Sequence, residues 1–107
     1  MQYTKKQIEI NNKSFVEIQI LEQEVGFSNI SELKEIVSSE IASGHNNIAI
    51  DMSSVRVINS SGLGVLISLL TKINATKGTL KLLNLNDKLK EIFQITRLDK
   101  VFDIDKF

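Results

Sequence analysis

The chain of 107 residues contains no cysteine, no proline and no tryptophan, and His45 is its single histidine. Without cysteine the sequence offers no thiol nucleophile, no disulfide and no cysteine-ligated zinc or iron–sulfur cluster. One histidine leaves little for an imidazole metal site. We therefore expect no metal and no other cofactor.

The chain also lacks a surplus of charge of either sign, because 13 basic and 13 acidic side chains cancel. Proteins that hold nucleic acid or an anionic membrane need a standing positive field, and no basic arm supplies one here. Apolar runs stay short of membrane-spanning length, and Lys5 and Lys6 precede a polar segment rather than a signal-peptide core. We expect one cytoplasmic domain over residues 1–107, with no direct nucleic-acid binding and no membrane insertion.

The apolar pattern predicts a hairpin at the start of the chain. Residues 3–10 and 15–21 both alternate between apolar and polar side chains, and Asn11-Asn12-Lys13 separates them. Such alternation is typical of half-buried strands, and a short polar break is typical of the turn between them.

The rest of the pattern predicts helices that alternate with buried strands. Helical spacing indicates a helix from about Ile30 to Ser43, with Asn29 and Glu32 as its capping pair, and a second helix from about Ser61 to Thr76. Further elements are expected as buried strands at 48–52 and 80–85, a short third helix capped by Asp87, an edge strand at 101–104, and element ends at Gly26, Gly44 and Gly78. This order predicts an α/β fold: an open mixed β-sheet with an N-terminal hairpin and right-handed βα units, with helices packed on the sheet.

The entry to the second helix departs from an ordinary helix start. Its residues are Asn59, Ser60, Ser61, Gly62, Leu63 and Gly64. A helix needs one side-chain cap, and three are available here, while each glycine costs about 1 kcal/mol relative to alanine. The glycines therefore indicate close approach, either of a neighbouring strand or of another molecule. A plain cap with tight helix–sheet packing is the structural alternative, but the segment follows a strand at the sheet edge where partners bind.

Catalytic motifs do not fit the same residues. A nucleophile elbow needs glycine two residues before the serine, and neither Ser60 nor Ser61 has one. A phosphate-binding P-loop needs a lysine that the residues after Gly64 do not supply. We expect His45 to be a solvated loop residue and Asp51 to cap a loop, so a hydrolase or nucleotide-binding enzyme using Ser60 or Asp51 is a minor alternative.

In these residues the chain resembles the STAS domain, and specifically the bacterial anti-sigma factor antagonists. The resemblance rests on Asp51, Ser53, Val55, Ile58, Ser60-Ser61-Gly62-Leu63-Gly64 and Leu66, and continues through Gly78, Leu80, Leu82, Ile92-Phe93, Thr96, Leu98 and Phe102. It implies that Ser60 accepts phosphate from an anti-sigma factor that is also a serine kinase. It further implies that the unphosphorylated form binds this kinase and frees the sigma factor, and that a metal-dependent serine phosphatase restores the binding form.

The chain departs from the family pattern at Asn59, at Arg97 and over residues 21–27. Asn59 stands where the family most often has aspartate, and residues 21–27 replace a common Gly-acidic-apolar-Asp stretch. Arg97 replaces a common glycine, from which we expect little consequence. The loss of a carboxylate at Asn59 favours an alternative function, a STAS accessory or scaffold subunit of a transporter or signalling assembly that is never phosphorylated.

Overall fold

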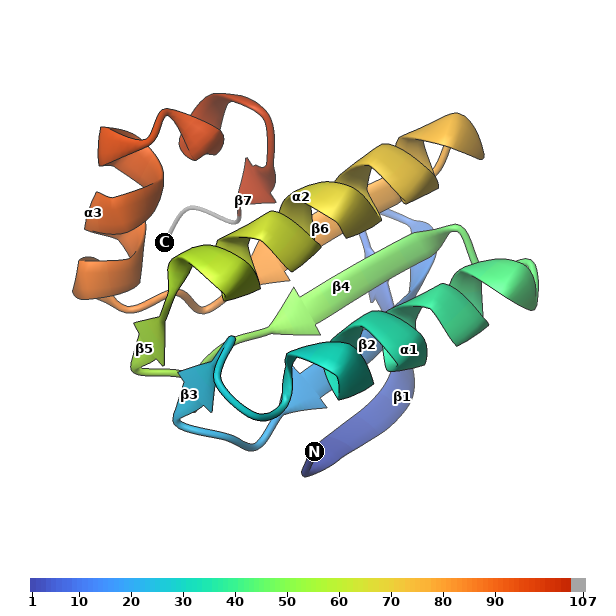
Figure 1. Ribbon diagram of the computed structural model, residues 1–107. Helices are drawn as coiled ribbons and strands as arrows, with labels where there is room; N and C mark the ends of the chain where they lie inside the picture. Colours follow the sequence, from blue (N-terminus) through green and yellow to red (C-terminus); the bar gives the residue numbers. More distant parts are fainter. Residues whose placement is uncertain (105–107) are drawn as a thin grey trace.

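A mixed β-sheet with helices packed on one face forms the fold, as the computed structural model shows for residues 1–104 (Figure 1). The remaining residues of the domain expected over 1–107 lie outside the described part. The sheet has five strands in the order β1 (Tyr3–Ile10), β2 (Lys13–Ile20), β4 (Asn47–Asp51), β6 (Thr79–Leu83) and β7 (Asp103–Ile104). β1 runs antiparallel to β2, and the other neighbouring strands are parallel. The expected open mixed sheet and N-terminal hairpin are confirmed.

The helical elements follow the predicted order. They are α1 (Ile30–Ala42), α2 (Ser60–Ala75), α3 (Asp87–Ile95) and a short 3₁₀ helix, η1 (Leu98–Lys100). Among the described residues, no helix combines the length and apolar character that crossing a membrane requires.

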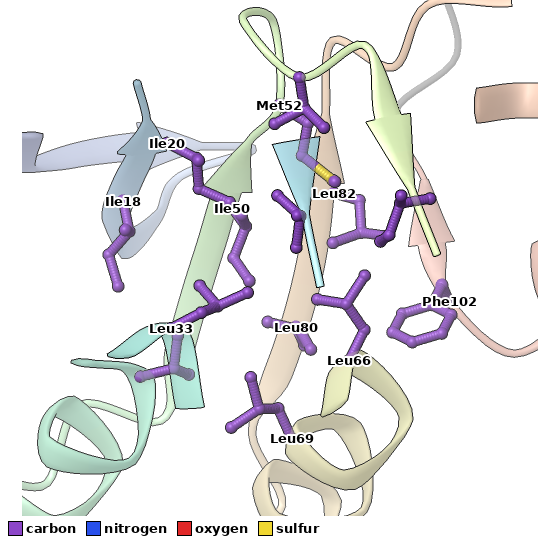
Figure 2. Packing of buried hydrophobic residues seen from close by; sticks show 14 of the residues in the cluster. Ile18, Ile20, Leu33, Ile50, Met52, Leu66, Leu69, Leu80, Leu82 and Phe102 are labelled. Carbon is purple, nitrogen blue, oxygen red and sulfur yellow. The ribbon is translucent and has the colours of Figure 1, made fainter. Parts of the chain in front are cut away.

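The core lies between the sheet and the helices (Figure 2). Alternate residues of the inner strands point toward the helices and are fully buried: Ile18, Ile48, Ile50 and Leu82. They pack with Leu33 of α1 and with Leu66 and Leu69 of α2. Burial of each such side chain contributes about 1.5–3 kcal/mol to stability. The apolar periodicities of the helices and of the strands therefore have the same cause, which is burial in this one core.

A second, smaller apolar cluster occupies the other face of the sheet. Phe15, Ala49 and Leu83 are its buried members, and Ile8 and Ile10 of β1 pack against it. The remaining side chains of β1 are exposed. The prediction of two half-buried strands therefore holds for β2 and is wrong for most of β1, because β1 is an edge strand with one neighbour.

A two-stranded parallel sheet, β3 (Glu24–Val25) with β5 (Val57–Ile58), was not predicted. Each strand has only two residues, which is too short for an alternating pattern to register in the sequence. The pairing joins the segments that lead into α1 and α2.

The predicted cap of α1 is wrong. The Asn29 side chain accepts a hydrogen bond from the Gly26 N–H (3.1 Å) and donates one to the Glu24 carbonyl (2.7 Å), so it makes no cap. Glu32 binds the amino terminus of Met1 instead of a helix end. Both side chains serve contacts between segments, which local sequence does not reveal.

The cap of α3 is shifted by one residue from the prediction. Asn86 accepts a hydrogen bond from the Leu89 N–H at 2.8 Å, and its backbone has the extended conformation of an N-cap. Asp87 is the first helical residue, where its charge favours the positive end of the helix.

The helix ends use glycine in different ways. Gly44 follows α1 with φ 94°, as expected for a C-terminal glycine. After α2, Lys77 takes the left-handed conformation (φ 61°), and Gly78 is required because a Cβ there would lie 1.8 Å from the Asn46 carbonyl oxygen. Arg97 also has φ 61°. The glycine common at this place in the family would suit that backbone better, contrary to the little consequence we expected.

Candidate functional site

Asn59 alone caps α2 and ties the helix start to the end of β3. Its Oδ1 accepts a hydrogen bond from the Gly62 N–H at 2.9 Å, and its Nδ2 donates to the Gly26 carbonyl at 2.8 Å. Its backbone N–H donates to the Val25 carbonyl at 3.2 Å. Of the three cap residues that the sequence left open, the structure selects Asn59 and leaves both serines without this task.

Gly26 is part of the site, although the sequence indicated only an element end. Its φ is 107°, and a Cβ there would lie 2.0 Å from Asn59 Oδ1 and 2.7 Å from the Gly62 backbone nitrogen. Only glycine lets the loop after β3 lie against the cap of α2. The sequence carries no local signal for this contact, because Gly26 and Asn59 are far apart along the chain.

The two glycines of the helix start have different surroundings. Gly62 is buried, and a Cβ there would lie 2.7 Å from Ile58 Cγ1 and 2.9 Å from the Val25 carbonyl oxygen. Gly64 is exposed, and a Cβ there would meet nothing within 4 Å. Gly62 therefore serves the close approach of a neighbouring strand, whereas internal packing does not explain Gly64.

Ser60 and Ser61 begin α2 with exposed side chains. Within residues 1–104 neither hydroxyl makes a hydrogen bond, and the side-chain cap of the helix comes from Asn59, which accepts from the Gly62 N–H. Ser60 and Gly64 are four residues apart and share one face of α2. Leu63 is partly buried and packs against the core. An exposed hydroxyl thus stands at the positive end of a helix, beside a glycine-flattened surface.

The start of α2 itself is uncharged and partly apolar, although the exposed Glu24 and Arg56 flank Val57. No charged residue occurs from Val57 to Thr71. Phe27, Val57 and Ile67 are exposed to 51%, 39% and 41%, and Ile67 lies on the same face of α2 as Ser60. We call Asn59–Gly64 together with these three apolar residues the α2 entry surface.

The carboxylate and the imidazole considered as catalysts are engaged elsewhere. Asp51 accepts hydrogen bonds from the Ser53 N–H (2.8 Å) and from Asn84 Nδ2 (3.1 Å), so it caps the loop after β4 as expected. His45 is exposed, but its Nδ1 lies 2.9 Å from Oε1 of the buried Glu40, so it is not simply solvated. Among residues 1–104 no group of three or more histidine, aspartate or glutamate side chains is arranged to hold a metal ion.

The family model of the STAS domain matches residues 9–106. The chain belongs to the STAS domain family. A Thermotoga maritima protein, provisionally named an anti-sigma factor antagonist, is 30% identical over 83 residues, which are 77% of this chain and 74% of that protein. The anti-sigma-B factor antagonist of Staphylococcus aureus is 25% identical over 77 residues, covering 72% and 71% of the two chains.

Solved structures support the same fold for this STAS domain. The crystal structure of the Thermotoga maritima protein has a TM-score of 0.77 at 23% identity and covers 96% of this chain and 86% of that one. The anti-sigma factor antagonist SpoIIAA in its unphosphorylated form has a TM-score of 0.69 at 17% identity, covering 97% and 89%. The phosphorylated form of the Bacillus protein SpoIIAA has a TM-score of 0.67 at 19% identity, covering 96% and 92%.

Proposed function

We propose that this STAS domain is a cytoplasmic, non-catalytic anti-sigma factor antagonist. It binds an anti-sigma factor serine kinase through Asn59–Gly64, and phosphorylation of Ser60 by that kinase switches the binding off. The kinase then returns to the sigma factor, so the switch controls sigma-factor-dependent transcription. A metal-dependent serine phosphatase acts on the phosphorylated form and restores binding.

The observation that carries this proposal is that, at the start of α2, one residue caps the helix and another leaves its hydroxyl exposed. Asn59 provides the cap, so the hydroxyl of Ser60 is exposed and free of hydrogen bonds within the described chain. Gly64, on the same face, carries no side chain and supports no internal contact. A serine that is not needed for the helix, beside a glycine that is not needed for the core, suits a surface that a partner covers.

Phosphate at Ser60 changes the binding surface more than the fold. It adds about 1.5–2 negative charges and three acceptor oxygens at a helix end that already favours an anion. The fold therefore tolerates it. A partner packed against the neutral α2 entry surface would instead have to desolvate a dianion, which opposes binding.

Incubation with ATP and a candidate kinase encoded beside this protein, followed by intact-mass measurement and peptide mapping, tests the proposal. We expect one phosphate at Ser60, none in Ser60→Ala, and an unchanged level in Ser61→Ala, which is the matched control. We further expect Ser60→Asp to weaken kinase binding by more than tenfold, or about 1.4 kcal/mol, and Ser60→Ala to bind but resist release by ATP.

Phosphate on Ser61 alone would contradict the assignment of Ser60. Kinase binding by Ser60→Asp equal to that of the unmodified protein would contradict the switch itself.

A STAS accessory or scaffold subunit is the second candidate function, and Asn59 favours it. Its amide donates to the Gly26 carbonyl, a hydrogen bond that the ionised aspartate common in the family could not make. A site maintained as a rigid, uncharged surface suits permanent assembly. Affinity capture distinguishes the two functions: recovery of a small ATP-binding kinase supports the switch, and recovery of a transporter ATPase without phosphate on Ser60 supports the scaffold.

A further inference from the structure

The outer edge of β1 is an open strand edge. β1 is the first strand of the sheet, and among residues 1–104 its only strand neighbour is β2 (Figure 1). The register runs without a bulge from Tyr3 opposite Ile20 to Ile10 opposite Lys13. The strand contains no proline, and it is longer than the two-residue strand β7 at the opposite edge of the sheet. Proline, bulges, shortness and charged side chains, lysine above all, are the usual ways in which proteins block an edge, and of these β1 has only its charged side chains.

The backbone groups that face outward can be assigned from the turn. Asn11 and Asn12, with φ 52° and 65°, form a two-residue turn, so the flanking pair Ile10 and Lys13 is hydrogen bonded. The hydrogen bond from the Leu21 N–H to the Gln2 carbonyl (2.9 Å) continues this alternation at the other end. Even-numbered residues of β1 therefore bond to β2. The N–H and carbonyl groups of Tyr3, Lys5, Gln7 and Glu9 point outward, and no partner for them occurs within residues 1–104.

The lysines of β1 do not leave an uncompensated positive charge at this edge, which would oppose pairing with another strand. Lys5 Nζ lies 3.0 Å from Glu40 Oε2, and Lys6 Nζ lies 3.8 Å from Glu17 Oε1. Both charges are thus compensated within the chain. Glu9 makes no ion pair or hydrogen bond with its side chain in the described part. An edge with balanced lysines and one free carboxylate is suited to a partner strand that offers a cation opposite Glu9.

We propose that β1 pairs antiparallel with β1 of a second copy of this chain, with the two-fold axis between the two Gln7 residues. In this register Lys5 of each copy lies opposite Glu9 of the other, and the Lys5 side chain, 52% exposed beside Glu40, keeps ammonium donors for this second carboxylate. Residues 5, 7 and 9 all direct their backbone groups outward, so these opposed pairs are the hydrogen-bonded ones. The two sheets then form one continuous sheet, and the interface is isologous, as two-fold symmetry requires.

Neighbouring registers are less favourable. Moving the axis toward the N-terminus by one residue places Lys6 opposite Lys6, and opposed like charges on a sheet are destabilising. Moving it toward the C-terminus by one residue places Ile8 opposite Ile8 but leaves Glu9 opposite Gln7 and shortens the pairing. Only the Gln7-centred register matches a cation with an anion twice. This dimer uses β1 and leaves the start of α2 outside the interface, so it does not depend on the proposed function.

Sedimentation equilibrium over about 10 μM to 1 mM, the range in which small interfaces associate, tests for the dimer. We expect a mass that rises from 12.0 kDa toward twice that value. Gln7→Pro removes an outward N–H that the monomer does not use, and it should weaken dimerisation at least tenfold. Gln7→Thr keeps the N–H and is the matched control. Monomer at every concentration would overturn the proposal.

Cysteine cross-linking tests the register, because the chain has no cysteine of its own. Opposed residues of a hydrogen-bonded antiparallel pair have Cα atoms about 5.5 Å apart, within disulfide range. Gln7→Cys should therefore form a covalent dimer on mild oxidation. In Glu9→Cys the two thiols lie roughly 13 Å apart along the paired strands and should remain free. Cross-linking of Glu9→Cys but not of Gln7→Cys would overturn the proposed register. Cross-linking of these cysteines only to a different protein would overturn the pairing of two copies.

Discussion

Asn59 combines two roles that serine or ionised aspartate cannot combine. Its carbonyl oxygen caps α2 at Gly62, and its amide nitrogen donates to Gly26. Aspartate would keep the cap and lose the donor, with a carboxylate placed beside a carbonyl oxygen. At the residue scale, the departure of this chain from the family pattern is therefore accounted for by a contact with the loop after β3.

Gly62 and Gly64 provide a matched pair of substitutions. Gly62→Ala should destabilise the protein by about 1–3 kcal/mol, because its Cβ would overlap Ile58 and the Val25 carbonyl. Gly64→Ala should stabilise it by about 0.5–1 kcal/mol, because alanine favours helix and the space is open. Urea unfolding measures both.

For Gly64→Ala, the effect on partner binding should be opposite to the effect on stability. Gly64→Ala should weaken binding of the proposed kinase partner despite its greater stability, since its methyl group projects from the α2 entry surface. Equal stability of the two variants would contradict the distinction between an internal and an external glycine.

At the element scale, Glu40 links α1 to β1 and to the turn after the helix. Its carboxylate is bound by Lys5 Nζ at 3.0 Å and by His45 Nδ1 at 2.9 Å. Burial raises the pKa of Glu40, but the hydrogen bonds and charges of Lys5 and His45 outweigh it, so the pKa lies below its usual 4.5. The hydrogen bond to Glu40 is the main cause that raises the pKa of Lys5 above 10.5.

The pH dependence of stability should reveal this link. A carboxyl whose pKa is lowered by folding stabilises the fold above its unfolded pKa and loses that contribution as the pH falls through the folded value. The protein should therefore lose more stability than Glu40→Gln between neutral pH and a pH below 4.5. Urea unfolding at a series of pH values measures the difference. Parallel pH profiles for the two proteins would contradict a stabilising role for the Glu40 carboxylate.

Elements with long periodic patterns were predictable, and their ends were less so. The spacing of Leu33 and Val37 predicted α1 because the same residues face the core. The cap at Asn29 was wrong because Gly26 and Glu24 engage its side chain, and the cap at Asp87 was wrong by one residue because Asn86 caps α3. β3 and β5 lay beyond prediction, because two residues carry no period.

At the scale of the whole molecule, a contact between two aromatic rings anchors the segment after α3 to the core. Phe102 is buried, and its ring meets that of Phe93 of α3 edge-on, with centroids 5.6 Å apart and planes at 74°. This geometry is favourable for aromatic pairs. It joins α3 to the segment between η1 and β7, and β7 pairs with β6 at the edge of the sheet.

Removal of this anchor should destabilise the entire domain. We expect Phe102→Ala to lower the free energy of unfolding by about 3–5 kcal/mol, the usual cost of removing a buried phenylalanine ring. Val101→Ala, at a neighbouring residue that is 58% exposed, is the control and should change it by less than about 0.5 kcal/mol. Thermal or urea unfolding compares the variants. Similar losses for both would show that the C-terminal part is not anchored through Phe102.

The sequence by itself determined the α/β class, the hairpin and the unusual helix start at Asn59–Gly64, because periodicity and helix-start chemistry are local properties. Only the tertiary structure decided which residue caps α2, which glycine faces inward and why Gly26 is needed. Those answers depend on the loop after β3 lying against the start of α2. The physical reason is distance along the chain: Gly26 and Asn59 constrain each other through steric contact and a hydrogen bond that exist only after folding.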